Sequence, residues 1–335
     1  MAYIHKKKIG EKTYYTLRIS VRKGEKVIAK DIEVLGTNIS NIKIDDLEKK
    51  YSKEIRKSYY TIKKFLEKNK YEEELKNQKL KKQELLTTNQ LIKIESTKKH
   101  YCNKFLKLHK QTQKDILEVF LIRFAVNTTA IEGNTINLKE AIKLFKEDQI
   151  PKNHTTREVY DLTNTKKVFY ELLKNKQEIN KQLMINIHDK LLDNIDERKG
   201  FRNHDIHIFG QPFKPTPTQF IRRDIDLLLD WYQKNKKKLH PLELATLFHH
   251  KFENIHPFSD GNGRTGRMMM NLIMMQNNHP PIIIERRDRK EYLEVMSKAD
   301  KAIKKDLKAN GEEYSELIKF VTEQLVKSYW DVFLF

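Results

Sequence analysis

The chain contains neither glycine nor proline between Ile42 and Ile131. These two residue types interrupt helices most strongly, and the stretch is rich in Lys, Glu, Leu and Gln, which favour helices. The sequence therefore predicts long helices in this region, including an apolar-rich helix over residues 115–131. Runs of Lys and Glu are most often the solvated faces of such helices, so they do not by themselves indicate a binding site.

Three short runs of β-prone residues precede the helical region, over residues 2–8, 13–22 and 27–35. Gly10 and Gly24 lie between them at the predicted turns. We therefore expect a small basic antiparallel β-sheet module over residues 1–37, followed by a basic helical arm over residues 38–110.

Most of the positive charge lies in this front part. Of the formal net charge of +20, residues 1–125 carry +15 and the remaining residues +5. Positive charge attracts phosphate, so nucleic acid is one candidate partner of the front part. A solvated basic module that docks a target protein or forms a homodimer is the other interpretation, and the composition leaves both open.

The second half of the chain contains one dense cluster of chemically active residue types, at residues 256–267. A histidine, a carboxylate, three glycines and two arginines lie in this segment. Apolar residues at steps of three and four predict an amphipathic helix over residues 241–255, which Pro257 would end, and a buried helix over residues 264–275. The glycines would leave backbone N–H groups at the start of the second helix, which is a site that attracts phosphate.

Two common phosphate motifs do not account for this segment. Residues 261–266 match G-x-G-x-x-G, but a predicted helix precedes them where the dinucleotide fingerprint requires a strand. The Gly-Lys-Ser/Thr of a Walker A loop is absent from the segment. A plain turn between helices needs one glycine, not three with two arginines. We therefore interpret the segment as a nucleotide-phosphate site that contains its own proton acceptor.

The segment resembles the signature of Fic-domain proteins, His-x-Phe-x-Asp/Glu-Gly-Asn-Gly-Arg-x-x-Arg, at every specified position. The resemblance covers about residues 115–330. It implies a mainly α-helical Fic domain over residues 111–335 with a β-hairpin flap, and a protein adenylyltransferase that moves AMP from ATP to a hydroxyl side chain of a target protein, with Mg²⁺. The alternatives are de-adenylylation, another nucleotidyl or phosphoryl transfer at the same site, and a nucleic-acid-binding regulator with a secondary Fic site.

The resemblance assigns a role to each signature residue, and each role suits the side chain. His256 would be the general base, because imidazole titrates near neutral pH. Asp260 would be the metal ligand, since the hard cation Mg²⁺ prefers carboxylate oxygen. The other positions would bind the nucleotide phosphates through an anion hole and two guanidinium clamps. They are Gly261, Asn262, Gly263, Arg264 and Arg267.

Residues 128–134 resemble the inhibitory motif of this family, Ser/Thr-x-x-x-Glu-Gly/Asn. In that motif the glutamate, here Glu132, would pair with Arg267 and block the γ-phosphate, and residues 111–134 would form the inhibitory helix. Gly133 suits the position after a helix end. Asn137 followed by Glu140 predicts a capping box at the start of the next helix.

Residues 200–217 hold glycines and prolines around β-prone residues, which predicts a β-hairpin. In the family such a flap docks the target and covers the nucleotide, with Phe213 near its tip here. The residues expected to bind the nucleotide's adenosine are Asp205, Ile206, His207, Ile208 and Tyr292. The family often has a Tyr-Tyr pair and a later asparagine near the adenine. This chain has Tyr292-Leu293 and Asp300 instead, so we expect the adenine packing to differ.

The remaining sequence features indicate the compartment. The single cysteine, Cys102, excludes a disulfide framework and fits a reducing cytoplasm. The N-terminus is charged, unlike a signal peptide, and no long apolar run predicts a membrane span. We therefore expect a cytoplasmic protein that acts on a Ser, Thr or Tyr hydroxyl of a target protein.

Overall fold

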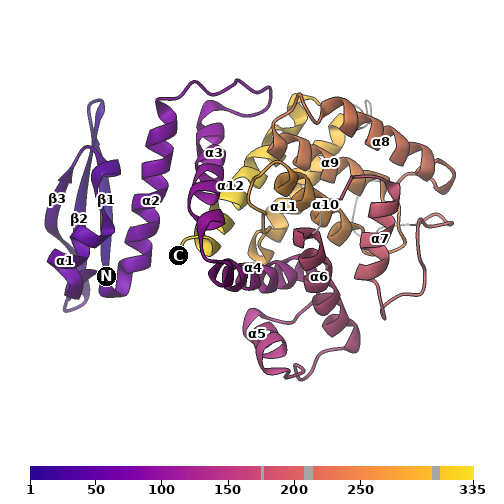
Figure 1. The fold of residues 1–335 in the computed structure, drawn as a ribbon, viewed down its shortest axis with the longest axis horizontal. Coiled ribbons are helices and arrows are strands. Elements are labelled where there is room, and N and C mark those ends of the chain that lie inside the picture. Colours follow the sequence, from indigo (N-terminus) through magenta and orange to yellow (C-terminus); the bar gives the residue numbers. More distant parts are fainter. Residues whose placement is uncertain (175–176, 207–213, 304–309) are drawn as a thin grey trace. The chain divides into compact units, whose positions relative to one another are not determined.

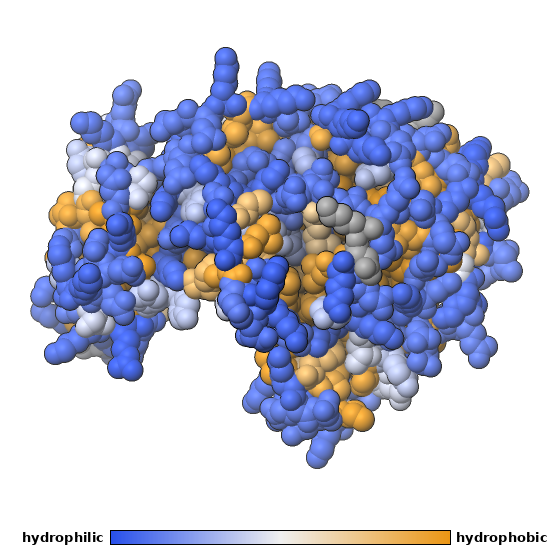
Figure 2. Space-filling view, viewed as in Figure 1, coloured by the Kyte–Doolittle hydropathy of each residue, from blue (hydrophilic) through white to orange (hydrophobic). Residues whose placement is uncertain are grey.

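The structure is a computed structural model that describes residues 1–174, 177–206, 214–303 and 310–335. The chain divides into two compact units. One contains Met1–Lys81, Leu91–His100 and Leu334, and the other contains Lys82–Gln90, Tyr101–Phe333 and Phe335. Hydrophilic side chains cover most of the face shown in Figure 2.

The first unit begins with a three-stranded antiparallel sheet in the order β1-β2-β3 (Figure 1). The strands are β1 (Ala2–Ile9), β2 (Lys12–Lys23) and β3 (Lys26–Gly36), so the predicted sheet is confirmed. Alternate residues of β1 and β2 are buried, which is the period-2 pattern of a sheet with one covered face. They pack in one core with Ile39 and with residues of α1 (Ile44–Ile55) and α2 (Tyr59–Lys76). The buried residues of this core are Ala2, Ile4, Tyr15, Leu17, Ile39, Leu47, Ile55, Ile62 and Leu66.

The predicted long helices are confirmed, but they are interrupted without glycine or proline. The described helices after α2 are α3 (Thr88–Asn103) and α4 (Lys110–Ile131), and short 3₁₀ turns occur at Arg56–Ser58 and Phe105–Lys107. Thr87 and Gln90 form a reciprocal cap at the start of α3. The backbone N–H of Thr87 donates to Gln90 Oε1 at 2.8 Å, and that of Gln90 donates to Thr87 Oγ1 at 3.3 Å. A capping pair thus begins a helix where no breaker residue marks its start.

The second unit is helical in its described residues. After α4 its helices are α5 (Leu138–Glu147), α6 (Thr156–Lys174), α7 (Lys181–Leu191), α8 (Ile221–Asn235), α9 (Pro241–Ile255), α10 (Asn262–Gln276), α11 (Arg289–Ile303) and α12 (Ser315–Val332). The predicted capping box of Asn137 and Glu140 starts α5. No helix among the described residues is long and apolar enough to span a membrane.

Helices α9 and α10 pack against each other and lie among the other helices of this unit (Figure 1). Their close approach depends on Gly266 of α10. A Cβ atom there would lie 2.6 Å from Glu253 Oε1 and 2.7 Å from His249 Nδ1. Because real Cβ atoms do not approach other atoms so closely, a side chain at this position would displace these two side chains of α9.

The predicted flap hairpin lies only partly within the described residues. His207, Ile208 and Phe213 lie outside them. The described flanks, residues 200–206 and 214–217, form no strand.

Candidate active site

The loop between α9 and α10 takes a sharp and well-anchored course. His256 follows the last residue of α9 with a left-handed φ of 50°, and its N–H donates to the Phe252 carbonyl at 3.0 Å. Gly261 has a φ of 72° and caps the start of α10. The side-chain amide of Asn262 both accepts from the N–H and donates to the carbonyl of Phe258, each at 2.9 Å. Asn262 therefore holds the loop with its side chain, so an anion would meet the backbone N–H groups of α10.

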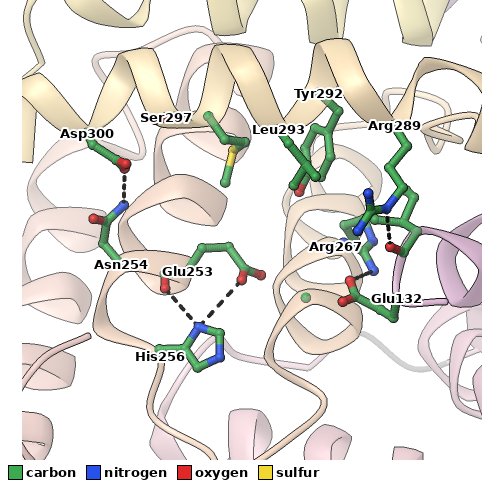
Figure 3. A pocket seen from close by; sticks show the side chains of 13 residues that line it. Glu132, Glu253, Asn254, His256, Arg267, Arg289, Tyr292, Leu293, Ser297 and Asp300 are labelled. Atoms are coloured by element: carbon green, nitrogen blue, oxygen red, sulfur yellow. Dashed lines mark hydrogen bonds and ion pairs between the residues drawn. The ribbon is translucent and has the colours of Figure 1, made fainter. Parts of the chain in front are cut away.

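Phe258 anchors this loop in the core. Its ring is fully buried and stacks on the His188 ring, with 3.8 Å between the ring centroids. Two residues earlier in the loop, the His256 ring is held by a contact of 3.2 Å between Nδ1 and the Glu253 carbonyl (Figure 3).

Both ionisable groups at the end of α9 are shifted toward their neutral forms. Burial lowers the pKa of His256 to about 4. Burial also raises the pKa of Glu253 to about 8, and its Oε2 lies 4.0 Å from His256 Nδ1. An imidazole with this pKa is neutral at pH 7, so it has a lone pair with which to accept a proton.

A cavity of about 230 Å³ opens beside His256. Residues of α9, α10 and α11 and the end of α4 form its walls (Figure 3). The lining residues are Ile131, Glu132, Glu253, Asn254, His256, Gly263, Arg267, Arg289, Tyr292, Leu293, Met296, Ser297 and Asp300.

Asp260 lies in a network of alternating charges at the start of α10. Its Oδ2 pairs with Arg157 of α6, and its Oδ1 accepts from the Gly261 N–H at 2.5 Å and lies 3.6 Å from Arg264 Nη2. Arg264 also pairs with the carboxylate of Asp161. Burial would raise the pKa of Asp260, but the positive Arg264 and the Gly261 N–H hold it below its usual value. The carboxylate is therefore ionised, as an oxygen ligand of Mg²⁺ must be.

Arg267 is buried and makes three hydrogen bonds to the end of α4. Its Nε donates to Thr128 Oγ1 at 2.6 Å, and its Nη2 donates to the Thr128 carbonyl at 3.0 Å and to Glu132 Oε1 at 2.6 Å. A Cβ atom on Gly263 would lie 2.2 Å from the same Glu132 oxygen. The Glu132 carboxylate thus lies against the N-terminal turn of α10, where a helix binds an anion.

The end of α4 is also tied to the segment that leads into α11. Arg289 Nε donates to the Ile131 carbonyl at 2.7 Å, and the Arg286 N–H donates to Asn127 Oδ1 at 2.9 Å. These bonds keep the backbone next to Glu132 in place. The Glu132 side chain itself is 42% exposed.

The residues expected near the adenosine are only partly at the cavity. Tyr292 lines it, and its hydroxyl lies 2.6 Å from His249 Nε2. Asp300 lines it as well, and its Oδ1 lies 3.0 Å from His250 Nε2 and 3.1 Å from Asn254 Nδ2. Asp205 is not among the lining residues, and its carboxylate instead accepts from the N–H and hydroxyl of Thr218 at 2.8 and 2.7 Å. Ile206 is likewise outside the lining set, and His207 and Ile208 lie outside the described residues.

Comparison with known families identifies this region. A sequence model of the Fic/DOC family matches residues 178–274, which include α7, the loop with His256 and nearly all of α10. The chain contains a Fic/DOC-family domain. The Fic domain resembles the protein adenylyltransferase Fic of Nematostella vectensis, which is 31% identical over 179 residues, or 52% of this chain and 42% of the relative.

One further relative and one solved structure agree with this match. A probable protein adenylyltransferase of Aquifex aeolicus is 28% identical over 185 residues, covering 55% of this chain and 52% of the relative. The chain thus spans about half the length of these curated relatives. The crystal structure of a Fic-domain-containing signaling protein from Bacteroides thetaiotaomicron matches 71% of this chain and 95% of its own chain, with a TM-score of 0.64 and 20% identity. This last likeness supports the Fic fold.

Several residues at the Fic domain's site were not predicted from the sequence. Glu253 lies three residues before His256 at the end of a predicted helix, and residues three apart on a helix are neighbours, so this spacing could have placed Glu253 beside His256. Arg157 and Asp161 carried no such signal. They lie on α6, far along the chain from the signature, and only the folded structure brings them to Asp260 and Arg264.

Proposed function

We propose that the Fic domain transfers AMP from ATP to a hydroxyl group of a target protein. The observation that carries this proposal is the position of His256. A neutral, half-buried imidazole lies in the loop that leads into the N-terminus of α10, beside an ionised carboxylate and two buried arginines. A proton acceptor next to an anion-binding helix end is the arrangement that attack of a hydroxyl on a phosphate requires. The adenylyltransferase names of the relatives point to the same chemistry.

The proposed reaction uses few groups of the protein. His256 accepts the proton of a Ser, Thr or Tyr hydroxyl of the target, and the oxygen of that hydroxyl attacks the α-phosphorus of ATP. A new P–O bond forms there, the bond from the α-phosphorus to the bridging oxygen of the β-phosphate breaks, and pyrophosphate leaves. The backbone N–H groups at Gly261 and Gly263 stabilise the charge on the α-phosphate oxygens, and Arg264 and Arg267 bind the β- and γ-phosphates.

Asp260 is the proposed Mg²⁺ ligand. Its ionised carboxylate fits this hard cation, which is commonly held by one or two carboxylates together with substrate phosphates. When bound, the cation would neutralise charge on the phosphates. Arg157 pairs with the same carboxylate in this structure, so it has to move when the cation binds.

We also propose that Glu132 inhibits the reaction. Its carboxylate takes up one of the Arg267 donors and lies against the first turn of α10. Both positions are needed by the phosphates in the proposed reaction. A triphosphate can therefore bind productively only after Glu132 has moved away.

The first prediction concerns which phosphorus is transferred. We expect target proteins in a cell lysate to be labelled when the Glu132→Gly chain is incubated with Mg²⁺ and α-³²P-ATP, and not with γ-³²P-ATP, because only the α-phosphorus moves in this reaction. Labelled bands on a denaturing gel give the measurement. Label from the γ-position alone would mean phosphoryl transfer and contradict the proposal. Release of AMP from a protein that is already modified would support de-adenylylation instead.

We propose a second function for the first unit, binding of duplex nucleic acid through the outer face of its sheet. Paired residues of an antiparallel sheet share a face, so Tyr3 with Arg18 and Lys7 with Tyr14 lie opposite the buried face. Arg22 lies on the same outer face of β2. Arg18 is neutralised by Asp31 at 2.5 Å, so Lys7 and Arg22 supply the positive charge. Basic side chains among aromatic ones suit a phosphate backbone.

The second prediction tests this surface. We expect the affinity for a short DNA duplex to fall steeply as salt rises, because binding releases counterions. Reversing Lys7 and Arg22 to glutamate should weaken binding and reduce the salt slope by about 1 for each phosphate that the protein no longer neutralises. Fluorescence anisotropy at two salt concentrations measures both effects. Reversing the exposed Lys238 and Lys290 of the second unit is the matched control and should leave binding near the parent's. Equal weakening by both pairs, or no binding at about 50 mM salt, would contradict the proposal.

A further inference from the structure

Arg202 is a buried arginine in the segment between α7 and α8. Its side chain is 1% exposed. The nearest carboxylate is that of Asp205, whose Oδ1 lies 3.7 Å from Arg202 Nη1, and the Asp205 side chain is 76% exposed. Burying a charged group is unfavourable unless its donors are satisfied. Neutral carbonyl and hydroxyl oxygens accept nearly all the hydrogen bonds of the Arg202 guanidinium. Its role is therefore to join the segments that carry these oxygens.

On one side Arg202 holds the backbone of the active-site loop. Its Nε donates to the His256 carbonyl at 2.9 Å, and its own N–H donates to the Pro257 carbonyl at 2.9 Å. His256 has a left-handed φ of 50°, which is uncommon for a residue with a side chain. Its carbonyl lies at the C-terminal end of α9, where a positive charge is favourable. Arg202 thus stabilises the backbone conformation that directs the imidazole.

On the other side Arg202 holds the chain before and after residues 207–213. Its Nη1 donates to the His204 carbonyl at 2.9 Å and to Thr218 Oγ1 at 3.1 Å, and its Nη2 donates to the Thr216 carbonyl at 2.5 Å. One guanidinium therefore joins three stretches of chain: the residues just after it, the residues that lead into α8, and the loop of His256. Such a planar group with five donors has few replacements, since lysine offers only a single point charge.

We propose that Arg202 is a positioning residue for the transfer reaction, which holds the backbone of His256 together with the chain at His204 and at residues 216–218. This inference rests on the proposed AMP transfer. Arg202 does not touch the reacting atoms in this account. It acts through His256, whose ring would otherwise move relative to the N-terminus of α10. Misplacing a catalytic group by about 1 Å can lower a rate about 100-fold.

The test uses the full chain carrying Glu132→Gly, so that transfer can be followed. We expect Arg202→Ala and Arg202→Lys each to lower kcat by about 100-fold with little change in the KM for ATP, because the phosphate-binding groups are untouched. Added guanidinium ion should restore part of the activity of Arg202→Ala and none of that of Arg202→Lys. Arg198→Met is the matched control: Arg198 lies nearby, is 59% exposed and pairs with Asp196, so its loss should leave kcat unchanged. An unchanged kcat in both Arg202 variants would overturn the inference.

A second readout does not depend on transfer. The charge of Arg202 contributes to the low pKa of His256, after the larger effect of burial. The ring of His256, followed by NMR in a pH titration, should therefore titrate at higher pH in Arg202→Ala, which removes the charge, and should show several signals in Arg202→Lys, which keeps the charge but not the planar set of donors. If the Glu132→Gly chain with Arg202 intact transfers no AMP, the proposed function fails, and a single, unaltered His256 titration in both folded Arg202 variants would separately overturn the role of Arg202.

Discussion

Replacing Glu132 with glycine is expected to raise auto-adenylylation between about tenfold and about a hundredfold. The carboxylate accepts a hydrogen bond of 2.6 Å from the buried Arg267, and a hydrogen bond to a charged group contributes about 1.5–3 kcal/mol. Each 1.4 kcal/mol corresponds to a factor of about ten. Without Glu132 the guanidinium and the first turn of α10 are both available to the phosphates. Intact-protein mass at equal ATP and Mg²⁺ measures the added AMP.

Two controls separate loss of the Glu132–Arg267 contact from other effects of the substitution. Glu147 is also a glutamate at a helix end, the last residue of α5, and it is exposed, so Glu147→Gly should leave auto-adenylylation unchanged. Arg267→Ala removes the partner of Glu132 and also the guanidinium that would bind the phosphates, so it should not raise auto-adenylylation. If Glu132→Gly is no more active than the parent chain, Glu132 serves as a helix-end residue or as a base in de-adenylylation, and the inhibitory proposal is wrong.

Replacing His256 with alanine is expected to lower AMP transfer by about 10²- to 10⁴-fold in the Glu132→Gly chain, since this is the usual contribution of a general base. Nucleotide binding should persist, because the proposed phosphate contacts come from α10 and its arginines. Label from α-³²P-ATP measures transfer, and equilibrium binding of ATP measures the nucleotide site.

The left-handed backbone of His256 calls for a second variant. Asparagine adopts this conformation more readily than alanine, so His256→Asn tests the loss of the base with less change to the backbone. We expect His256→Asn to be as inactive as His256→Ala while its thermal unfolding stays closer to the parent's. A folded His256→Asn chain that still transfers AMP at the parent's rate would rule out His256 as the base.

Features that depend on neighbours in the sequence were predictable. The apolar spacing and Pro241 predicted a helix over residues 241–255, and α9 has the same bounds. Likewise the three short β-prone runs, separated by turns at Gly10 and Gly24, predicted the three strands of the sheet, and Asn137 with Glu140 predicted the capping box of α5. These elements form from local propensity, capping and periodic burial, all of which can be inferred from a window of a few residues.

Local chemistry also located the centre of the candidate site. Residues 256–267 hold the proposed base, the carboxylate, the glycines and both arginines on one short loop and the helix after it. These residues are neighbours along the chain, so any fold that keeps this helix–loop–helix also keeps them close together. The Asn262 side chain was expected to bind the nucleotide phosphates, but in the structure it bonds to the protein backbone. It holds the backbone of Phe258, because a buried amide must satisfy its own hydrogen bonds before it can serve a ligand.

The sequence by itself determined the elements, the signature loop and the residue types available for chemistry. Only the tertiary structure decided their partners: Arg157 on Asp260, Asp161 on Arg264, and Arg202 on the His256 carbonyl. These contacts join segments separated by tens of residues, and a surface arginine has the same sequence signature as a buried one. Which charges meet depends on how α6, α9 and α10 pack, and packing is set by the shape of the whole core rather than by any local pattern.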